Sequence, residues 1–117
     1  MSHQVLIALG SNSRPTVFMA WAAGRLTALL SDVRFSRIIW TKDVKGGGRL
    51  YMNRLAYGTT DLTALELQQA LKAMEAETGR SRELVTLDLD LMQYDQERHH
   101  LNDWPRPYIQ QLLPDLT

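Results

Sequence analysis

Residues 87–91 alternate strictly between leucine and aspartate, and this pattern constrains the fold more than any other feature of the chain. Successive side chains of a β-strand point to opposite faces. The three leucines would therefore line a core, while Asp88 and Asp90 share the other face with their Cα atoms ~7 Å apart. Two carboxylates on one face favour binding of a divalent cation.

The residues just before this segment carry the opposite charge. Gly79 is a typical stop for a preceding helix, and Arg80 and Arg82 follow it closely. Taken alone, the arginines would be helix C-terminal charges and the aspartates a solvated strand face. Together they predict a site for a phosphate ligand, because guanidinium groups bind phosphate oxygens in pairs and Mg²⁺ combines one or two carboxylates with phosphate oxygens.

The remaining periodicity predicts the elements around this strand. Apolar and β-branched runs predict three further strands, and apolar spacings of three and four residues predict two helices. In chain order these are a strand at 5–9, a helix at 16–30, strands at 33–41 and 50–57, and a helix opened by a capping box at 63–66. The last two strands are expected to pair as a hairpin.

The resulting order is βαββαβ. It is typical of an α+β, ferredoxin-like domain, in which helices cover one face of an antiparallel sheet and the other face is free for a ligand. Residues 1–117 are expected to form a single domain, and 96–117 a short, polar and irregular tail.

Composition excludes several classes of function. Lys plus Arg equals Asp plus Glu at 13 each, so no global field favours nucleic acid or an anionic membrane. The absence of cysteine excludes disulfides and thiolate sites, and is compatible with a reducing compartment. No secretory leader and no apolar run of ~18 residues is found. We therefore expect a cytoplasmic monomer with no nucleic-acid or membrane partner.

These features, in this order, resemble the 6-hydroxymethyl-7,8-dihydropterin pyrophosphokinases of folate biosynthesis. Four stretches carry the resemblance: 8–12, Thr41, 51–53 and 75–90. The resemblance implies a Mg²⁺-dependent kinase that transfers pyrophosphate from ATP to the hydroxymethyl group of the pterin and releases AMP. ATP and a pterin would be its small-molecule partners.

The resemblance also implies roles for particular side chains. The two aspartates would hold two Mg²⁺ ions bridging the ATP phosphates, and the two arginines would contact those phosphates. The implied catalytic residues are Arg80, Arg82, Asp88 and Asp90. The implied pterin-binding residues are Thr41, Val44, Tyr51 and Asn53, and the implied nucleotide-binding residues are Arg80, Arg82 and Arg106. Tyr51 would stack on the pterin ring, and Asn53 would bind its edge.

The chain departs from the family pattern at several positions. Val85 stands where an arginine is usual, and Arg106 stands where a histidine is usual. The loop between Arg82 and Asp88 comprises only residues 83–87, whereas the family usually has a longer loop there. Two other classes of function stay open on this basis. One is a weakly active or inactive relative that binds pterin or nucleotide as a sensor or subunit. The other is a protein-interaction domain that uses its sheet face.

Overall fold

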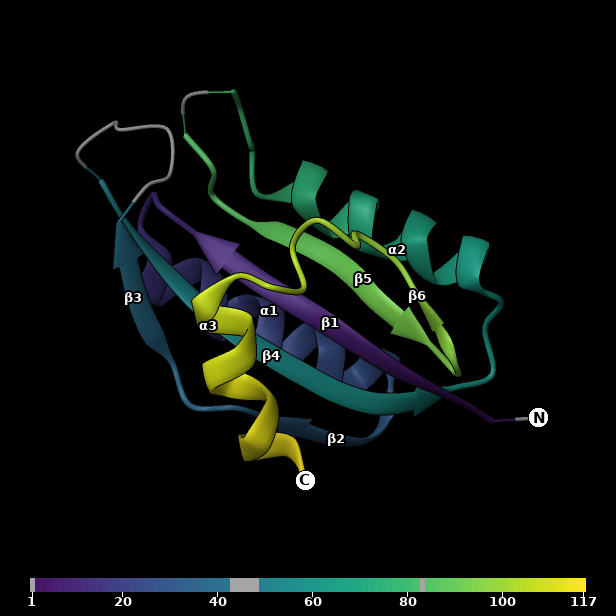
Figure 1. The fold of residues 1–117 in the computed structure, drawn as a ribbon. Helices are drawn as coiled ribbons and strands as arrows, with labels where there is room; N and C mark the ends of the chain where they lie inside the picture. The colour runs from purple at the N-terminus through teal and green to yellow at the C-terminus, as the bar shows by residue number, and fades with distance from the viewer. Residues whose placement is uncertain (1, 43–48, 83) are drawn as a thin grey trace.

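The computed structural model describes residues 2–42, 49–82 and 84–117 (Figure 1). These residues build one six-stranded antiparallel sheet in the order β2-β4-β1-β5-β6, with β3 also paired to β4. The strands are β1 (His3–Ser11), β2 (Ser31–Phe35), β3 (Ile39–Lys42), β4 (Leu50–Thr60), β5 (Asp88–Tyr94) and β6 (Glu97–Arg98). Strand β1 is central because its apolar residues 5–9 are buried on both faces.

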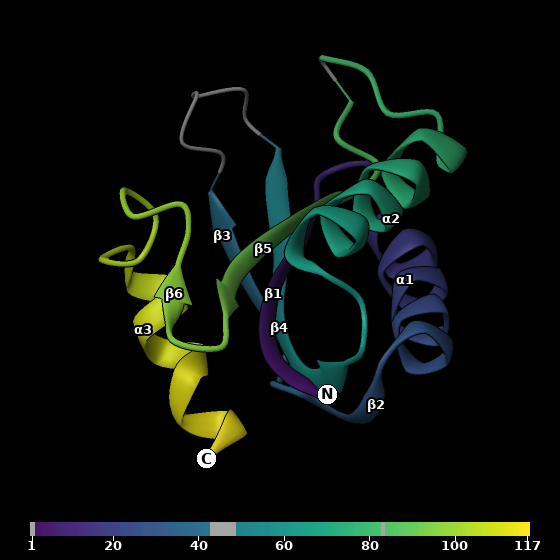
Figure 2. The ribbon, with the colours of Figure 1, turned by 90° about the vertical axis from the view of Figure 1, so that its right-hand side faces the viewer.

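Two helices, α1 (Pro15–Leu29) and α2 (Ala64–Glu77), cover one face of the sheet (Figure 2). The predicted capping box opens α2: the Thr63 hydroxyl accepts from the Glu66 N–H at 3.1 Å, and the Glu66 carboxylate accepts from the Thr63 N–H at 2.9 Å. Gly79 follows the helix with a φ of 76°, which favours glycine. The predicted α+β, ferredoxin-like class is confirmed.

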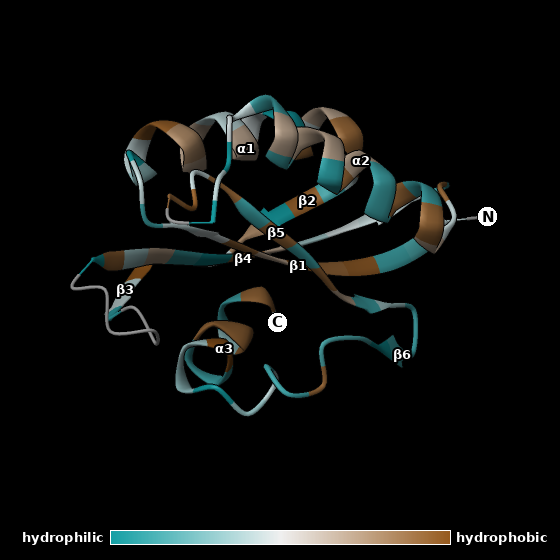
Figure 3. Ribbon diagram, turned by 90° about the horizontal axis from the view of Figure 1, so that it is seen from above, coloured by the Kyte–Doolittle hydropathy of each residue, from teal (hydrophilic) through white to brown (hydrophobic). Residues whose placement is uncertain are grey.

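The C-terminal tail differs from its prediction. It contains β6, the helix α3 (Pro107–Leu112) and the 3₁₀ helix η1 (Leu113–Leu116), and the two helices lie on the face opposite α1 and α2 (Figure 3). The tail buries Trp104, Ile109, Leu112 and Leu116 against that face. The expectation that this face is free is therefore wrong where the tail packs on it. The tail's apolar residues follow no regular spacing in the sequence, and they meet their partners on the sheet only in the folded structure.

The single strand predicted at 33–41 is interrupted. Ser36 is buried, and its hydroxyl accepts from the Leu55 N–H at 2.8 Å, while its own N–H donates to the Leu55 carbonyl at 2.9 Å. This side-chain bond replaces a regular ladder bond and separates β2 from β3. Both strands still pair with β4, so the predicted hairpin of β3 with β4 is confirmed. No helix in the described ranges is both long and apolar enough to span a bilayer.

Candidate active site

Asp88 and Asp90 line a cavity of about 170 Å³ on the sheet face opposite α1 and α2. The leucines between and beside them are buried under those helices, so the alternation predicted from the sequence is confirmed. Gly10 lies opposite Asp88 in the β1–β5 register. A Cβ atom at Gly10 would project toward Tyr51 and Asn53, at 3.8 and 3.9 Å from their nearest atoms, so glycine keeps this part of the cavity open.

The β3–β4 hairpin forms the opposite wall of the cavity. Its register sets Thr41 against Tyr51 and Ile39 against Asn53, and Thr41, Tyr51 and Asn53 all line the cavity. Asn53 is buried, and its Nδ2 donates to the Thr41 hydroxyl at 2.9 Å. The amide is thereby held with Oδ1 toward Gly10, at the cavity wall. The predicted site residue Val44 lies outside the described residues.

A second hollow of about 870 Å³ adjoins the cavity and shares Tyr51 and Asp88 with it. Three cationic side chains line this hollow: Lys72, Arg80 and Arg82. Arg80 Nη1 donates to Asp88 Oδ1 at 3.0 Å and lies 3.1 Å from Glu75 Oε2. Burial alone would lower the pKa of Arg80, but the charges of Asp88 and Glu75 outweigh it and raise that pKa.

Glu75 ties α2 to β5 at the centre of the site. Its side chain is 6% exposed, and Oε2 accepts a hydrogen bond of 2.7 Å from the Leu89 N–H, between the two aspartates. The same oxygen contacts Arg80, and Oε1 lies 3.4 Å from Lys72 Nζ. Glu75 therefore fixes the position of Arg80 relative to the strand that carries the aspartates. Glu75 belongs to the stretch 75–90 that carries the resemblance, but the sequence alone does not show that this side chain positions Arg80.

Asn12 holds Val85, which lies between the arginines and the aspartates. Its Oδ1 accepts from the Val85 N–H at 2.8 Å, and its own N–H donates to the Val85 carbonyl at 2.9 Å. Thr78 and Thr86 add a hydroxyl–hydroxyl bond of 2.7 Å. These contacts place the apolar Val85 on the wall of the second hollow. Arg80 and Arg82 supply the guanidinium groups of that wall.

The two aspartates have the electrostatics of a cation site. Burial, followed by the charge and hydrogen bond of Asp88, raises the pKa of Asp90 to about 7, and the charges of Glu75 and Asp103 add to this effect. A bound cation would relieve this repulsion. The described residues contain no cluster of three or more side chains suited to a metal ion. A pair of carboxylates fits Mg²⁺, which keeps waters and takes its other ligands from phosphate oxygens.

The raised pKa of Asp90 has a consequence for stability. The folded chain holds the proton of the Asp90 carboxyl more tightly than the unfolded chain does. The free energy of unfolding therefore falls as pH rises from about 4 toward 7, and the loss is greatest above pH 7, where the carboxyl is ionised. We expect Asp90→Asn to raise the free energy of unfolding by on the order of 2 kcal/mol at pH 8 without Mg²⁺, and by much less at pH 4.5. Thermal melts in EDTA at the two pH values measure this. An equal gain at both would contradict it.

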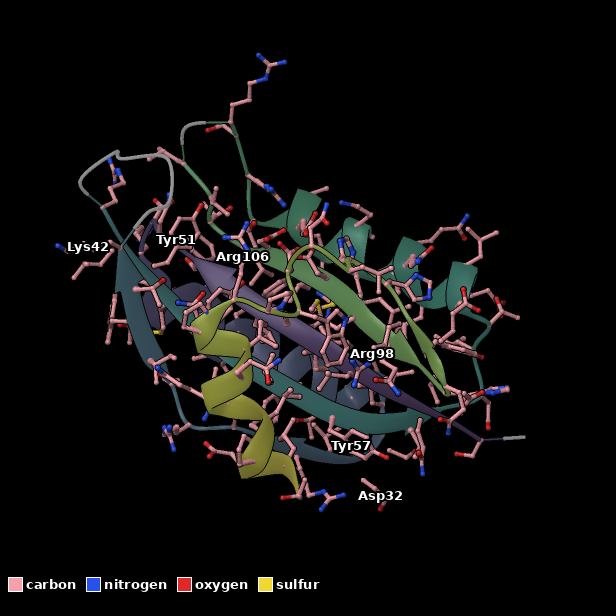
Figure 4. The ribbon with its side chains drawn as sticks, in the orientation of Figure 1. Asp32, Lys42, Tyr51, Tyr57, Arg98 and Arg106 are labelled. Carbon is pink, nitrogen blue, oxygen red and sulfur yellow. The ribbon has the colours of Figure 1, made fainter. Side chains whose placement is uncertain are left out.

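The tail contributes residues that sequence reasoning missed. Asp103 and Tyr108 line the cavity together with the predicted Arg106, and Asp103 Oδ1 accepts from Arg106 Nε at 2.9 Å. Figure 4 shows Tyr51 and Arg106 at the same end of the sheet, with Lys42 beyond them at its edge. The sequence of the tail shows no periodic pattern, so the contribution of Asp103 and Tyr108 to the cavity becomes evident only from the path of the tail across the sheet. Burial raises the pKa of Tyr108.

All of the predicted site residues within the described ranges lie in these two adjoining hollows. Thr41, Tyr51, Asn53, Asp88, Asp90 and Arg106 line the cavity, and Arg80 and Arg82 line the second hollow. The family model of 7,8-dihydro-6-hydroxymethylpterin-pyrophosphokinase (HPPK) matches residues 6–115. The chain belongs to the HPPK family. A search of curated proteins finds no match.

Membership of the HPPK family defines the reaction. HPPK enzymes are Mg²⁺-dependent pyrophosphokinases of folate biosynthesis, and they act on ATP and 6-hydroxymethyl-7,8-dihydropterin. The predicted family, activity and substrates are confirmed at this level. The roles of individual residues, the number of metal ions, the monomeric state and the cytoplasmic location stay predictions.

Proposed function

We propose that residues 1–117 act as one monomeric, cytoplasmic pterin pyrophosphokinase domain whose two substrates meet at Asp88 and Asp90. The observation that carries this proposal is the sharing of residues between neighbouring hollows. Asp88 borders both the cavity and the second hollow, which is called the cationic hollow from here on because Lys72, Arg80 and Arg82 line it. Asp90 borders the cavity and a third hollow of about 370 Å³ between α2 and β5. Lys72 borders both the cationic hollow and the third hollow.

The cavity is the proposed pterin site. A flat, polar heterocycle needs an aromatic surface and a few directed hydrogen bonds. Tyr51 supplies the ring, and Asn53 supplies a buried amide whose orientation is fixed by its bond to Thr41. Gly10 leaves the space that a side chain would fill. This arrangement would present the hydroxymethyl group to the aspartate side of the cavity.

The cationic hollow is the proposed triphosphate site. Arg80, Arg82 and Lys72 line this hollow and can contact phosphate oxygens, and Arg106 lines the adjoining cavity. Asp88 and Asp90 would hold two Mg²⁺ ions, which neutralise charge on the phosphates when bound. The third hollow has an apolar wall of leucines and carries the amide side chains Gln68 and Gln69, which suits the nucleotide base.

The proposed contribution of the chain to the reaction is positioning and charge neutralisation. The hydroxymethyl oxygen attacks the β-phosphorus of ATP and releases its proton to water, the bond from that phosphorus to the α-phosphate oxygen breaks, and AMP leaves with that oxygen. Charge on the transferred group is spread over its oxygens, so aimed cationic groups stabilise the transition state. Glu75 holds Arg80, and Asn12 holds Val85, in place before the substrates bind.

An AMP-release assay tests the proposed function. Purified protein with ATP, Mg²⁺ and 6-hydroxymethyl-7,8-dihydropterin is expected to release AMP only when all three are present, as measured by chromatography. Tight pterin and MgATP binding without AMP release would instead support the sensor or subunit hypothesis. Absence of both binding and AMP release would favour an interaction domain and overturn the proposal.

Asn53→Ala is expected to raise the KM for the pterin roughly tenfold and to change kcat much less, because it removes a polar contact to the ring edge. The substitution also leaves the Thr41 hydroxyl without this partner. Steady-state kinetics with varied pterin at saturating MgATP measure the effect. Asn102→Ala, at an exposed asparagine, is the matched control. Equal KM values for the two variants would remove Asn53 from the pterin site.

A further inference from the structure

A fourth hollow, of about 530 Å³, lies between the sheet and the tail. It is bordered by Gln4 and Leu6 of β1, Tyr57 of β4, and residues of α3 and η1. It shares no lining residue with the catalytic cavity, which borders the other end of β1 around Gly10. Helix α3 separates the two: Tyr108 faces the cavity, and Gln110 faces this fourth hollow.

The fourth hollow has the size and lining of a small-molecule site. Its floor and one wall are apolar, with Leu6, Leu113 and Leu116 contributing aliphatic surface. Tyr57 and Trp104 contribute aromatic surface. Ligand sites of several hundred Å³ with mainly apolar and aromatic walls are typical for compounds of two or three rings. The site described above for ATP and pterin makes no use of this hollow.

The charged groups around the fourth hollow favour an anion. The guanidinium of Arg98 lies 4.0 Å from the centroid of the Trp104 ring, and that of Arg34 lies 5.3 Å from the Tyr57 ring. Figure 4 shows Tyr57 and Arg98 on the α3 side of the sheet. Within the described residues, neither arginine has a carboxylate at ion-pair distance. Asp95 is the one acidic side chain among the described residues that line the hollow. Its Oδ2 lies 2.7 Å from Nδ1 of His3, and its Oδ1 accepts a hydrogen bond of 3.0 Å from the Gln4 N–H.

We propose that the fourth hollow binds a small aromatic anion, such as an aryl carboxylate or aryl sulfonate. The ring system would lie on the aliphatic floor between Tyr57 and Trp104, and the anionic group would contact Arg98. The aromatic walls suit a flat body, and the cation held over Trp104 suits one negative charge at its rim. This proposal does not depend on the residue roles proposed for the catalytic site.

The test uses 8-anilinonaphthalene-1-sulfonate as the probe, titrated by fluorescence into the whole chain with saturating MgATP. We expect one saturable site with a Kd on the order of 10–100 µM, as typical for a ligand of this size. Arg98→Gln should raise that Kd roughly tenfold, since it removes the charge-assisted contact. Arg25→Gln is the matched control, because Arg25 pairs with Glu77 and lies outside this hollow.

A second pair of variants separates this site from other apolar surfaces. Gln4 is exposed at the rim, so Gln4→Trp should fill the hollow and abolish the signal, whereas Gln4→Ala should not. Unchanged melting temperatures would show that the folds are intact. A probe Kd that is markedly higher with saturating MgATP than without it, or a Kd unaffected by Arg98→Gln and Gln4→Trp, would overturn the proposal. A dimer by light scattering that Gln4→Trp dissociates would identify a second copy as the occupant, and would also overturn it.

Discussion

Asp88→Asn is expected to lower the rate of pterin-dependent AMP release by at least about 10³-fold, because it removes half of the charge that the proposed metal site offers. The amide keeps the shape of the side chain and can still contact Arg80, which retains Glu75 as a partner. The fold should therefore survive. Rates at saturating substrates, with calorimetric titration of MgATP, measure the effect, and both kcat and MgATP affinity are expected to fall.

Asp32→Asn is the matched control for this substitution. Asp32 is exposed beside β4, has a φ of 53° that asparagine tolerates, and lies away from the cavity (Figure 4). The same change of charge there should leave the rate within about twofold. If Asp88→Asn and Asp32→Asn gave similar rates and similar MgATP affinities, the metal assignment would be wrong.

Arg80→Ala is expected to lower kcat/KM for ATP by about 10²- to 10³-fold, comparable with the loss of one group that stabilises developing charge. In the free chain this guanidinium neutralises Glu75 and Asp88, at 3.1 and 3.0 Å. Its removal takes away a phosphate contact and also leaves those two carboxylates to repel each other and the ligand. Kinetics with varied ATP at fixed pterin separate the change in KM from the change in kcat.

Two further variants make the Arg80 experiment decisive. Arg80→Lys should recover part of the loss, since it restores a charge but not the fork that contacts two groups at once. Arg25→Ala breaks the 2.9 Å ion pair with Glu77 between α1 and α2, outside the catalytic hollows, and should leave kinetics unchanged. A purely structural role for Arg80 would appear as a lower melting temperature with unaltered KM for ATP.

The features of the site that could be predicted from the sequence are those that depend on short patterns of neighbouring residues. The alternation at 87–91 depends only on the two-residue period of a strand, so it placed Asp88 and Asp90 on one face without knowledge of the rest of the fold. The capping box began α2 and Gly79 ended it, both through backbone hydrogen bonding and conformation within a few residues. The same rule of alternation placed Tyr51 and Asn53 together on β4.

Other features were decided by contacts between distant segments. Ser36 interrupts a strand because Leu55 lies beside it, and the tail became ordered because the sheet offered its apolar residues a surface. The pKa of Asp90 depends on burial and on charges from several elements, including Asp103 of the tail. The sequence by itself determined which side chains share a face, because strand and helix periods are local. Only the tertiary structure decided which faces meet, because burial and charge interactions join residues far apart in the chain.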